Sequence, residues 1–165
     1  MKRIQIGTLL IALLIPLIVG GLSAALSAPG MEKYGTMAKP PLSPPAWVFP
    51  VAWTILYCMM GLATYFVVTS NADSKSKAFA LMLYAVQLVM NFAWSILFFK
   101  WEMKLFAFIW LIVMWLIVIL CTFRFFAIDR TAGILMIPYI AWLSFAAYLN
   151  MGAYILQTDV TPGIR

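Results

Sequence analysis

Five long apolar stretches, separated by short groups of charged and turn-forming residues, are the feature that most constrains this chain. Each is close to the ~20 residues that a helix needs to cross a bilayer. Hydrocarbon offers no water to backbone N–H and C=O groups, so a spanning segment must be a helix or part of a closed barrel. The alternating ten-residue pattern of barrel strands is absent. We therefore predict an all-α, five-transmembrane-helix bundle formed by one domain, residues 1–165, with spans at about 4–27, 46–69, 78–99, 105–127 and 132–157.

Composition agrees with a membrane protein, because 65% of the residues are hydrophobic and only 10% are charged. The net charge of +6 lies in the short connectors, which favours anionic lipid as a partner and argues against nucleic acid. Basic residues number six on the N-terminal side and five on the other side, so the positive-inside rule does not orient the chain.

The first stretch has two interpretations. Lys2 and Arg3 precede it, as in a secretory signal, but it is long for the apolar part of such a signal. A close contact between membrane helices fits its small residues better, and these are Gly20, Gly21, Ala24, Ala25 and Ala28.

Several classes of site are not indicated. The chain has no histidine, and Cys58 and Cys121 both fall inside apolar runs, so no metal site is predicted. No nucleophile and base are arranged as in a hydrolase, and no acidic or basic residue falls in the middle of a span. Ion-coupled pumps normally need such residues, so that class of function is disfavoured.

Aromatic and amide side chains recur at helical spacing in three of the spans. Phe49, Trp53 and Tyr57 form one row in the second span, just after a proline-rich loop at 28–45 that is predicted to act as a rigid lid. The third and fifth spans carry similar rows, comprising Tyr84, Gln87, Asn91, Ser95 and Phe98, and Tyr139, Trp142, Ala146, Asn150 and Ala153. These rows fit a pocket for a flat apolar ligand, but helix packing would produce the same pattern.

Three blocks of sequence carry a further pattern: PLSPPAWVF and VAWTILY within 41–57, QLVMNFAWSILFF at 87–99, and PYIAWLSFAAYLN at 138–150. In order and spacing they resemble the tryptophan-rich sensory protein/translocator protein family, also called the peripheral-type benzodiazepine receptor or TspO/MBR family. The resemblance spans essentially the whole chain. It implies a multi-pass protein of a bacterial cell membrane, a five-helix bundle with an internal ligand pocket capped by the long first loop, and a homodimer.

The resemblance also implies ligands and residues. Members bind porphyrins, sterols and benzodiazepine-type compounds, so porphyrin-like molecules and sterol are the expected small-molecule partners. Trp53 and Trp142 match the tryptophans associated with porphyrin chemistry, and they would be catalytic only if porphyrin is degraded. No cofactor is expected beyond porphyrin as ligand or substrate. The ligand-binding residues carried over are Trp47, Phe49, Trp53, Tyr57, Asn91, Trp94, Phe98, Tyr139, Trp142, Phe145, Ala146 and Leu149.

The function expected from these observations is a membrane receptor or sensor that binds tetrapyrroles and other flat hydrophobic molecules in the helix bundle. One alternative is an enzyme that degrades porphyrin with light and oxygen. Another is a porphyrin or sterol transporter, although an odd number of spans without an internal repeat argues against a repeat-built carrier.

Overall fold

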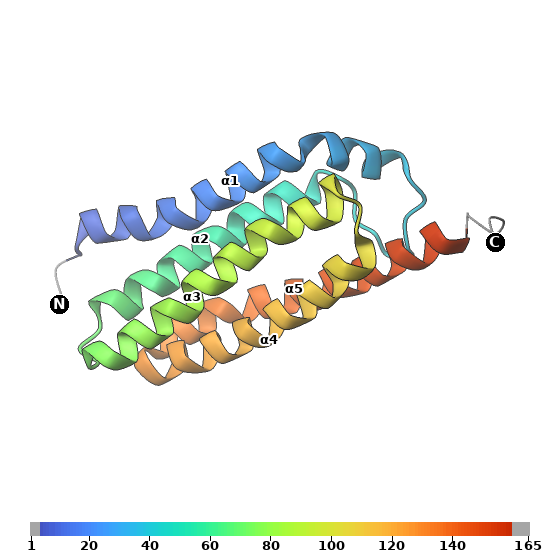
Figure 1. Ribbon diagram of the computed structural model, residues 1–165. Helices are drawn as coiled ribbons and strands as arrows, with labels where there is room; N and C mark the ends of the chain where they lie inside the picture. Colours follow the sequence, from blue (N-terminus) through green and yellow to red (C-terminus); the bar gives the residue numbers. More distant parts are fainter. Residues whose placement is uncertain (1–3, 160–165) are drawn as a thin grey trace.

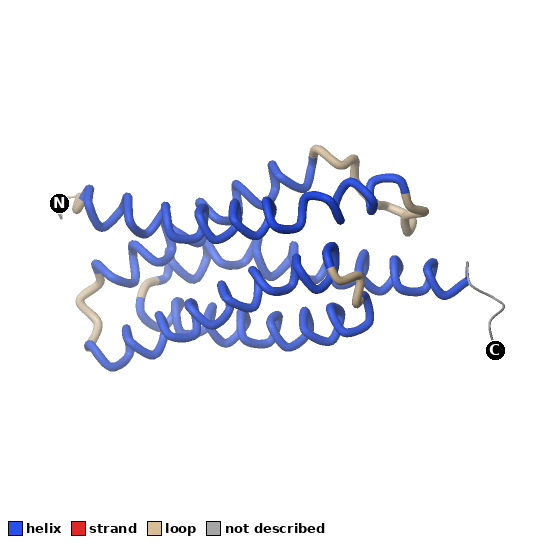
Figure 2. Tube along the Cα trace, turned by 45° about the horizontal axis from the view of Figure 1, so that its top comes forward, coloured by secondary structure: helices blue, strands red, loops and turns tan. Residues whose placement is uncertain are grey.

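The computed structural model describes residues 4–159, and within them the chain is helical, with no strand. Successive long helices run antiparallel, and their connectors lie at the two ends of the bundle (Figures 1 and 2). The all-α prediction is confirmed. The elements are α1 (Ile6–Thr36), α2 (Val48–Thr69), α3 (Ser74–Ser95), the short π-helix η1 (Ile96–Lys100), α4 (Lys104–Ile128) and α5 (Arg130–Asp159).

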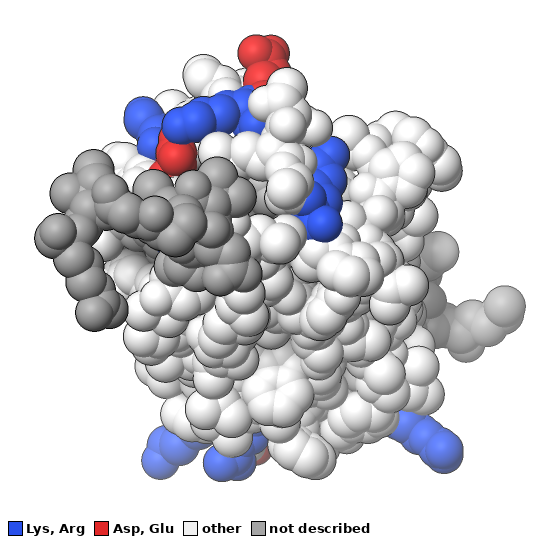
Figure 3. Space-filling model, turned by 90° about the vertical axis from the view of Figure 1, so that its right-hand side faces the viewer, with Lys and Arg blue, Asp and Glu red and all other residues white. Residues whose placement is uncertain are grey.

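All five long helices, α3 together with η1, are long and apolar enough to cross a membrane. Many of their large apolar side chains are exposed along the sides of the bundle, among them Leu14, Ile18 and Val113. Figure 3 looks onto the end of the bundle that carries the first loop, and several Lys, Arg and acidic side chains gather near the top of this end. This arrangement suits a protein whose sides face lipid.

Helix α1 lies at the edge of the bundle and packs on α2 and on η1, whereas α4 packs between α3 and α5. The buried residues of α1 form a stripe of small or compact side chains at three- and four-residue steps: Ala12, Pro16, Gly20, Ser23 and Ser27. Small residues let membrane helices approach closely. A contact through small residues therefore exists, but Gly20 is the one predicted member that is buried in it, and Gly21, Ala24, Ala25 and Ala28 are exposed.

The first loop is shorter than predicted, because α1 continues through Pro29 and ends at Thr36. A loop was expected from residue 28, but proline is tolerated in membrane helices when packing compensates for the lost donor. At Gly30 a Cβ atom would overlap the backbone carbonyl of Phe99. Glycine there lets the last turns of α1 rest directly on η1, which stabilises the extra helical turns.

The loop itself, residues 37–47, runs from α1 across to α5 and returns to the start of α2 (Figure 1). Tyr148 on α5 donates a hydrogen bond from its hydroxyl to the carbonyl oxygen of Pro41 at 2.7 Å. Pro40 is buried, and its ring lies against Gly152, where an added Cβ would meet it at 2.5 Å. These contacts hold the loop against α5 at this end of the bundle.

Candidate functional site

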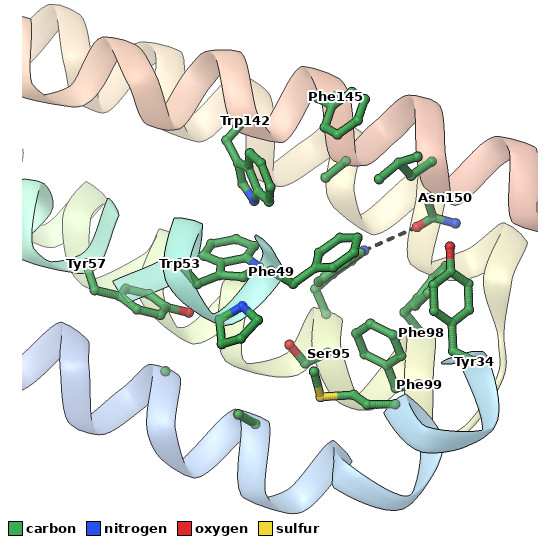
Figure 4. A pocket seen from close by; sticks show the side chains of 17 residues that line it. Tyr34, Phe49, Trp53, Tyr57, Ser95, Phe98, Phe99, Trp142, Phe145 and Asn150 are labelled. Atoms are coloured by element: carbon green, nitrogen blue, oxygen red, sulfur yellow. Dashed lines mark hydrogen bonds between the residues drawn. The ribbon is translucent and has the colours of Figure 1, made fainter. Parts of the chain in front are cut away.

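An aromatic cavity opens between α1, α2, η1 and α5 in the half of the bundle nearest the first loop. It encloses about 110 Å³, and most of its wall consists of rings and aliphatic groups (Figure 4). We call it the aromatic cavity. Its lining residues are Gly20, Ala24, Met31, Tyr34, Phe49, Pro50, Trp53, Tyr57, Trp94, Ser95, Phe98, Phe99, Trp142, Phe145, Ala146, Leu149 and Asn150.

Two tryptophans from different helices meet in this wall. The rings of Trp53 and Trp142 are 6.3 Å apart at 84°, an edge-to-face contact. Trp53 also stacks on Tyr57, at 5.5 Å and 27°, and Phe49 meets Trp142 edge-on at 6.1 Å. Because residues four apart lie on one face of a helix, the row on α2 delivers all three of its rings to the cavity.

The π-helix supplies a second group of rings. Phe98 and Phe99 are adjacent in sequence, yet both line the cavity, and their rings touch at 4.8 Å. A π turn adds one residue to the helical turn and often occurs at functional sites. Tyr34, near the end of α1, packs its ring edge-on against both phenylalanines, at 5.4 and 5.7 Å. Helix α1 and η1 therefore close one side of the cavity with three rings.

Few polar groups reach the cavity, and one of them is fixed by two hydrogen bonds. Asn150 accepts a hydrogen bond through Oδ1 from the indole N–H of Trp94 at 3.2 Å (Figure 4). Its Nδ2 donates to the backbone carbonyl of Lys104 at 2.8 Å. The amide thus ties α3, α5 and the start of α4 together at the cavity wall.

The deeper part of the same helix faces is closed by a chain of hydrogen bonds. Tyr57 donates to Oδ1 of Asn91 at 2.7 Å, and Nδ2 of Asn91 donates to the hydroxyl of Tyr139 at 3.0 Å. Tyr139 in turn donates to Oε1 of Gln87 at 2.9 Å, and Nε2 of Gln87 lies 3.8 Å from the sulfur of Met60. All five side chains are buried. We call this group the closed core.

A second cavity, of about 100 Å³, adjoins the aromatic cavity on the loop side. Four side chains line both cavities and therefore form the partition between them: Met31, Tyr34, Phe49 and Phe99. Of the described loop residues 37–47, Lys39 and Ala46 line this second cavity and none lines the first. The loop thus borders the outer compartment.

Nine of the twelve predicted ligand-binding residues line the aromatic cavity, whereas Trp47, Asn91 and Tyr139 do not. Trp47 immediately precedes α2, and its side chain is 67% exposed. Residues two apart in a helical turn point to different sides, and in this turn Phe49 is the residue that faces the cavity. Asn91 and Tyr139 are 2% and 0% exposed and belong to the closed core. For Gln87 and Asn91, helix packing is therefore the better interpretation.

Some lining residues were missed by the sequence prediction of the pocket. Met31 and Tyr34 belong to the part of α1 that was expected to be loop, and Phe99 reaches the wall only because η1 is a π-helix. Ser95 and Asn150 were assigned correctly to inward-facing rows. Among the described residues, no group of three or more His, Cys, Asp or Glu side chains is placed to hold a metal ion.

Comparison with known proteins gives the chain a family. The model of the TspO/MBR family matches residues 12–156. The chain belongs to the TspO/MBR family. It is 34% identical to tryptophan-rich protein TspO of Chlorobaculum tepidum, over 88% of this chain and 93% of that protein. It is 39% identical to the tryptophan-rich sensory protein of Cereibacter sphaeroides, over 74% and 75% of the two chains, and 35% identical to the translocator protein of Ovis aries, over 73% and 72%.

Membership of the TspO/MBR family and five apolar helices together make this chain a multi-pass integral membrane protein. The bacterial relatives are consistent with a bacterial membrane. The family resemblance found in the sequence is confirmed, whereas sterol binding and the homodimer stay predictions.

Proposed function

We propose that this TspO/MBR family member is a membrane receptor or sensor that binds porphyrin-like, flat hydrophobic molecules in the aromatic cavity. The observation that carries the proposal is the pair Trp53 and Trp142, whose rings meet at 6.3 Å in a wall formed almost entirely by aromatic and aliphatic groups. Aromatic walls bind flat rings by offset or edge-to-face stacking. The names of two relatives, a sensory protein and a translocator protein, support a role in binding or signalling.

Binding a molecule as large as a tetrapyrrole requires the cavity to widen. The aromatic cavity encloses about 110 Å³, whereas sites for drug-sized ligands enclose ~300–1,000 Å³. The second cavity provides room, because only the shared partition separates the two spaces. Rotation of the Phe49 and Tyr34 rings would join them and extend the site toward the first loop.

The test is a tetrapyrrole titration of the purified protein in detergent, followed by the ligand's absorbance and by tryptophan fluorescence. The double variant Trp53→Phe/Trp142→Phe should bind about tenfold more weakly, since each aromatic contact contributes ~0.5–1.5 kcal/mol. The matched control is Trp101→Phe/Trp115→Phe, which changes two tryptophans outside the cavity lining. Equal affinity in the wild type and the first double variant would refute the assignment of these two rings.

A second candidate function is light- and oxygen-dependent breakdown of porphyrin. It is favoured by the direct contact of two indoles in one cavity, since indoles can exchange electrons with an excited porphyrin. Illumination of the complex in the presence of oxygen should then yield a new absorbing product, and the Trp53→Phe/Trp142→Phe variant should abolish it. If the spectrum only bleaches, as for free porphyrin, this candidate is rejected.

A further inference from the structure

Lys104, the first residue of α4, is a buried cation directly behind the wall of the aromatic cavity. It is only 5% exposed. Its ammonium nitrogen lies 4.4 Å from the ring centre of Phe98 and 5.7 Å from that of Tyr34, and both rings line the cavity. Its backbone carbonyl accepts the hydrogen bond from Asn150, a third lining residue. Three contacts thus fix Lys104 against the outer side of this wall, where the lysine borders an open hollow that it shares with Glu102 and Tyr154.

Among the side chains that the structure describes, which end at Gln157, no carboxylate forms an ion pair with this ammonium. Glu102 is the acidic group that attracts it, but Glu102 forms its ion pair with Lys33, which repels Lys104. Two cations therefore share one anion, and the group carries excess positive charge. Ring faces attract a cation, yet a buried charge without a hydrogen-bonded counter-ion costs free energy. One further anion at this end of the cavity would complete the arrangement.

We infer that Lys104 binds an anionic group, a carboxylate, carried by the flat ligand of the aromatic cavity. The inference rests on the proposed function, since the apolar rings of that ligand would occupy the space beside Trp53 and Trp142. Figure 4 shows the Tyr34 hydroxyl and the Asn150 side chain at the same end of the cavity, so the polar end of the ligand meets polar groups there. Tyr34 is the ring that must turn aside for the carboxylate to reach the ammonium.

This arrangement makes the site selective for flat acids over their neutral esters. An ammonium–carboxylate hydrogen bond is stronger than a hydrogen bond between neutral groups. The alternative is that Lys104 is a boundary lysine that only directs its charge toward water and headgroups. Lys100, four residues earlier and exposed at the same end of the bundle, provides a matched control for that role.

The experiment compares a porphyrin dicarboxylic acid with its dimethyl ester, each titrated into the full-length protein in nonionic detergent. The quantity compared between variants is the ratio of the two Kd values. Each compound partitions into the detergent equally for every variant, so partitioning does not change how this ratio differs between variants. Lys104→Met should weaken binding of the acid about tenfold, as expected for loss of a hydrogen bond to a charged group, and leave the ester unchanged. Lys104→Arg should retain the preference for the acid, and Lys100→Met should match the wild type.

Glu102→Gln provides a second, independent measurement that keeps Lys104 in place. Removing the competing carboxylate should increase the preference for the acid. Equal weakening of acid and ester by Lys104→Met, or an unchanged ratio in Glu102→Gln, overturns the inference and leaves the proposed function standing. Failure of the wild type to bind either compound overturns both. If Lys104→Met does not fold, Glu102→Gln still decides the question.

Discussion

The aromatic cavity and the closed core are built from the same kinds of residue on the same helix faces, but they differ in how polar groups are satisfied. In the closed core, amides and phenols bond to one another across α2, α3 and α5 and leave little space. In the aromatic cavity, rings meet edge-on or stacked, and the one amide among the lining residues, Asn150, bonds to Trp94 and to the Lys104 carbonyl. The difference indicates that hydrogen bonding fixes the deep half of the bundle, whereas the half near the loop can change shape.

The sharpest test of this comparison is Asn91→Leu in the closed core. The change removes the amide oxygen that accepts a hydrogen bond from the Tyr57 hydroxyl. It also removes the amide N–H group that donates to the Tyr139 hydroxyl. We expect a loss of about 2–3 kcal/mol in the free energy of unfolding, since buried unsatisfied groups cost ~1–3 kcal/mol each and interhelical bonds in membranes fall at the low end. Unfolding in mixed micelles measures it. A variant as stable as the wild type would show that the core is held by packing alone.

A second substitution tests whether the cavity half depends instead on close backbone contact. Gly30→Ala places a methyl group against the carbonyl of Phe99, which belongs to the backbone of η1 and cannot rotate away. We expect a loss of about 2 kcal/mol, within the range for overpacking, and weaker binding of tetrapyrrole because Tyr34 and Met31 shift with the end of α1.

Gly21→Ala is the control for this substitution, since it lies on the same helix and an added Cβ there meets nothing within 4 Å. It should match or slightly exceed the wild type in stability, because alanine favours helix over glycine. Equal effects of the two alanines would mean that α1 moves freely on η1.

The same contrast explains how much the sequence could predict. Length and hydropathy predict the five helices, and a spacing of three and four residues predicts which side of each helix faces inward. Spacing does not say how deep a residue lies along that side. Asn91 and Trp94 belong to one inward-facing surface of α3, yet one is in the closed core and the other at the cavity. Which of the two environments a residue has depends on the side chains that the neighbouring helices place at the same depth in the bundle.

Two other features depend on tertiary contacts that no local pattern reveals. The extra turns of α1 beyond Pro29 exist because Gly30 packs on η1, and these turns bring Met31 and Tyr34 to the cavity. The burial of Lys104 was likewise not predicted, since a lysine in a short charged connector is normally solvated. It is the ring faces of Phe98 and Tyr34 that take this lysine out of solvent.

The comparison is refined most directly by replacing the asparagine at the aromatic cavity, Asn150→Leu, in the same way as Asn91→Leu in the closed core. This change removes the acceptor of the Trp94 indole and the donor to the Lys104 carbonyl. We expect a smaller loss of stability than for Asn91→Leu, about 1 kcal/mol, because the freed indole borders a cavity that water can enter and cross-helix bonds in membranes are worth ~0.6–2 kcal/mol. Unfolding in mixed micelles, side by side with the Asn91 variant, gives the difference.

Ligand affinity should rank these two variants in the opposite order. Asn150→Leu changes a lining residue and frees both the Trp94 ring and the start of α4, whereas Asn91 does not line the cavity and reaches its wall only through the hydrogen bond from Tyr57. A tetrapyrrole titration at a temperature where both variants are folded should therefore show the weaker binding for Asn150→Leu. If Asn91→Leu weakened binding as much, the closed core would have to transmit its disorder to the cavity, and the two halves would behave as one cooperative unit.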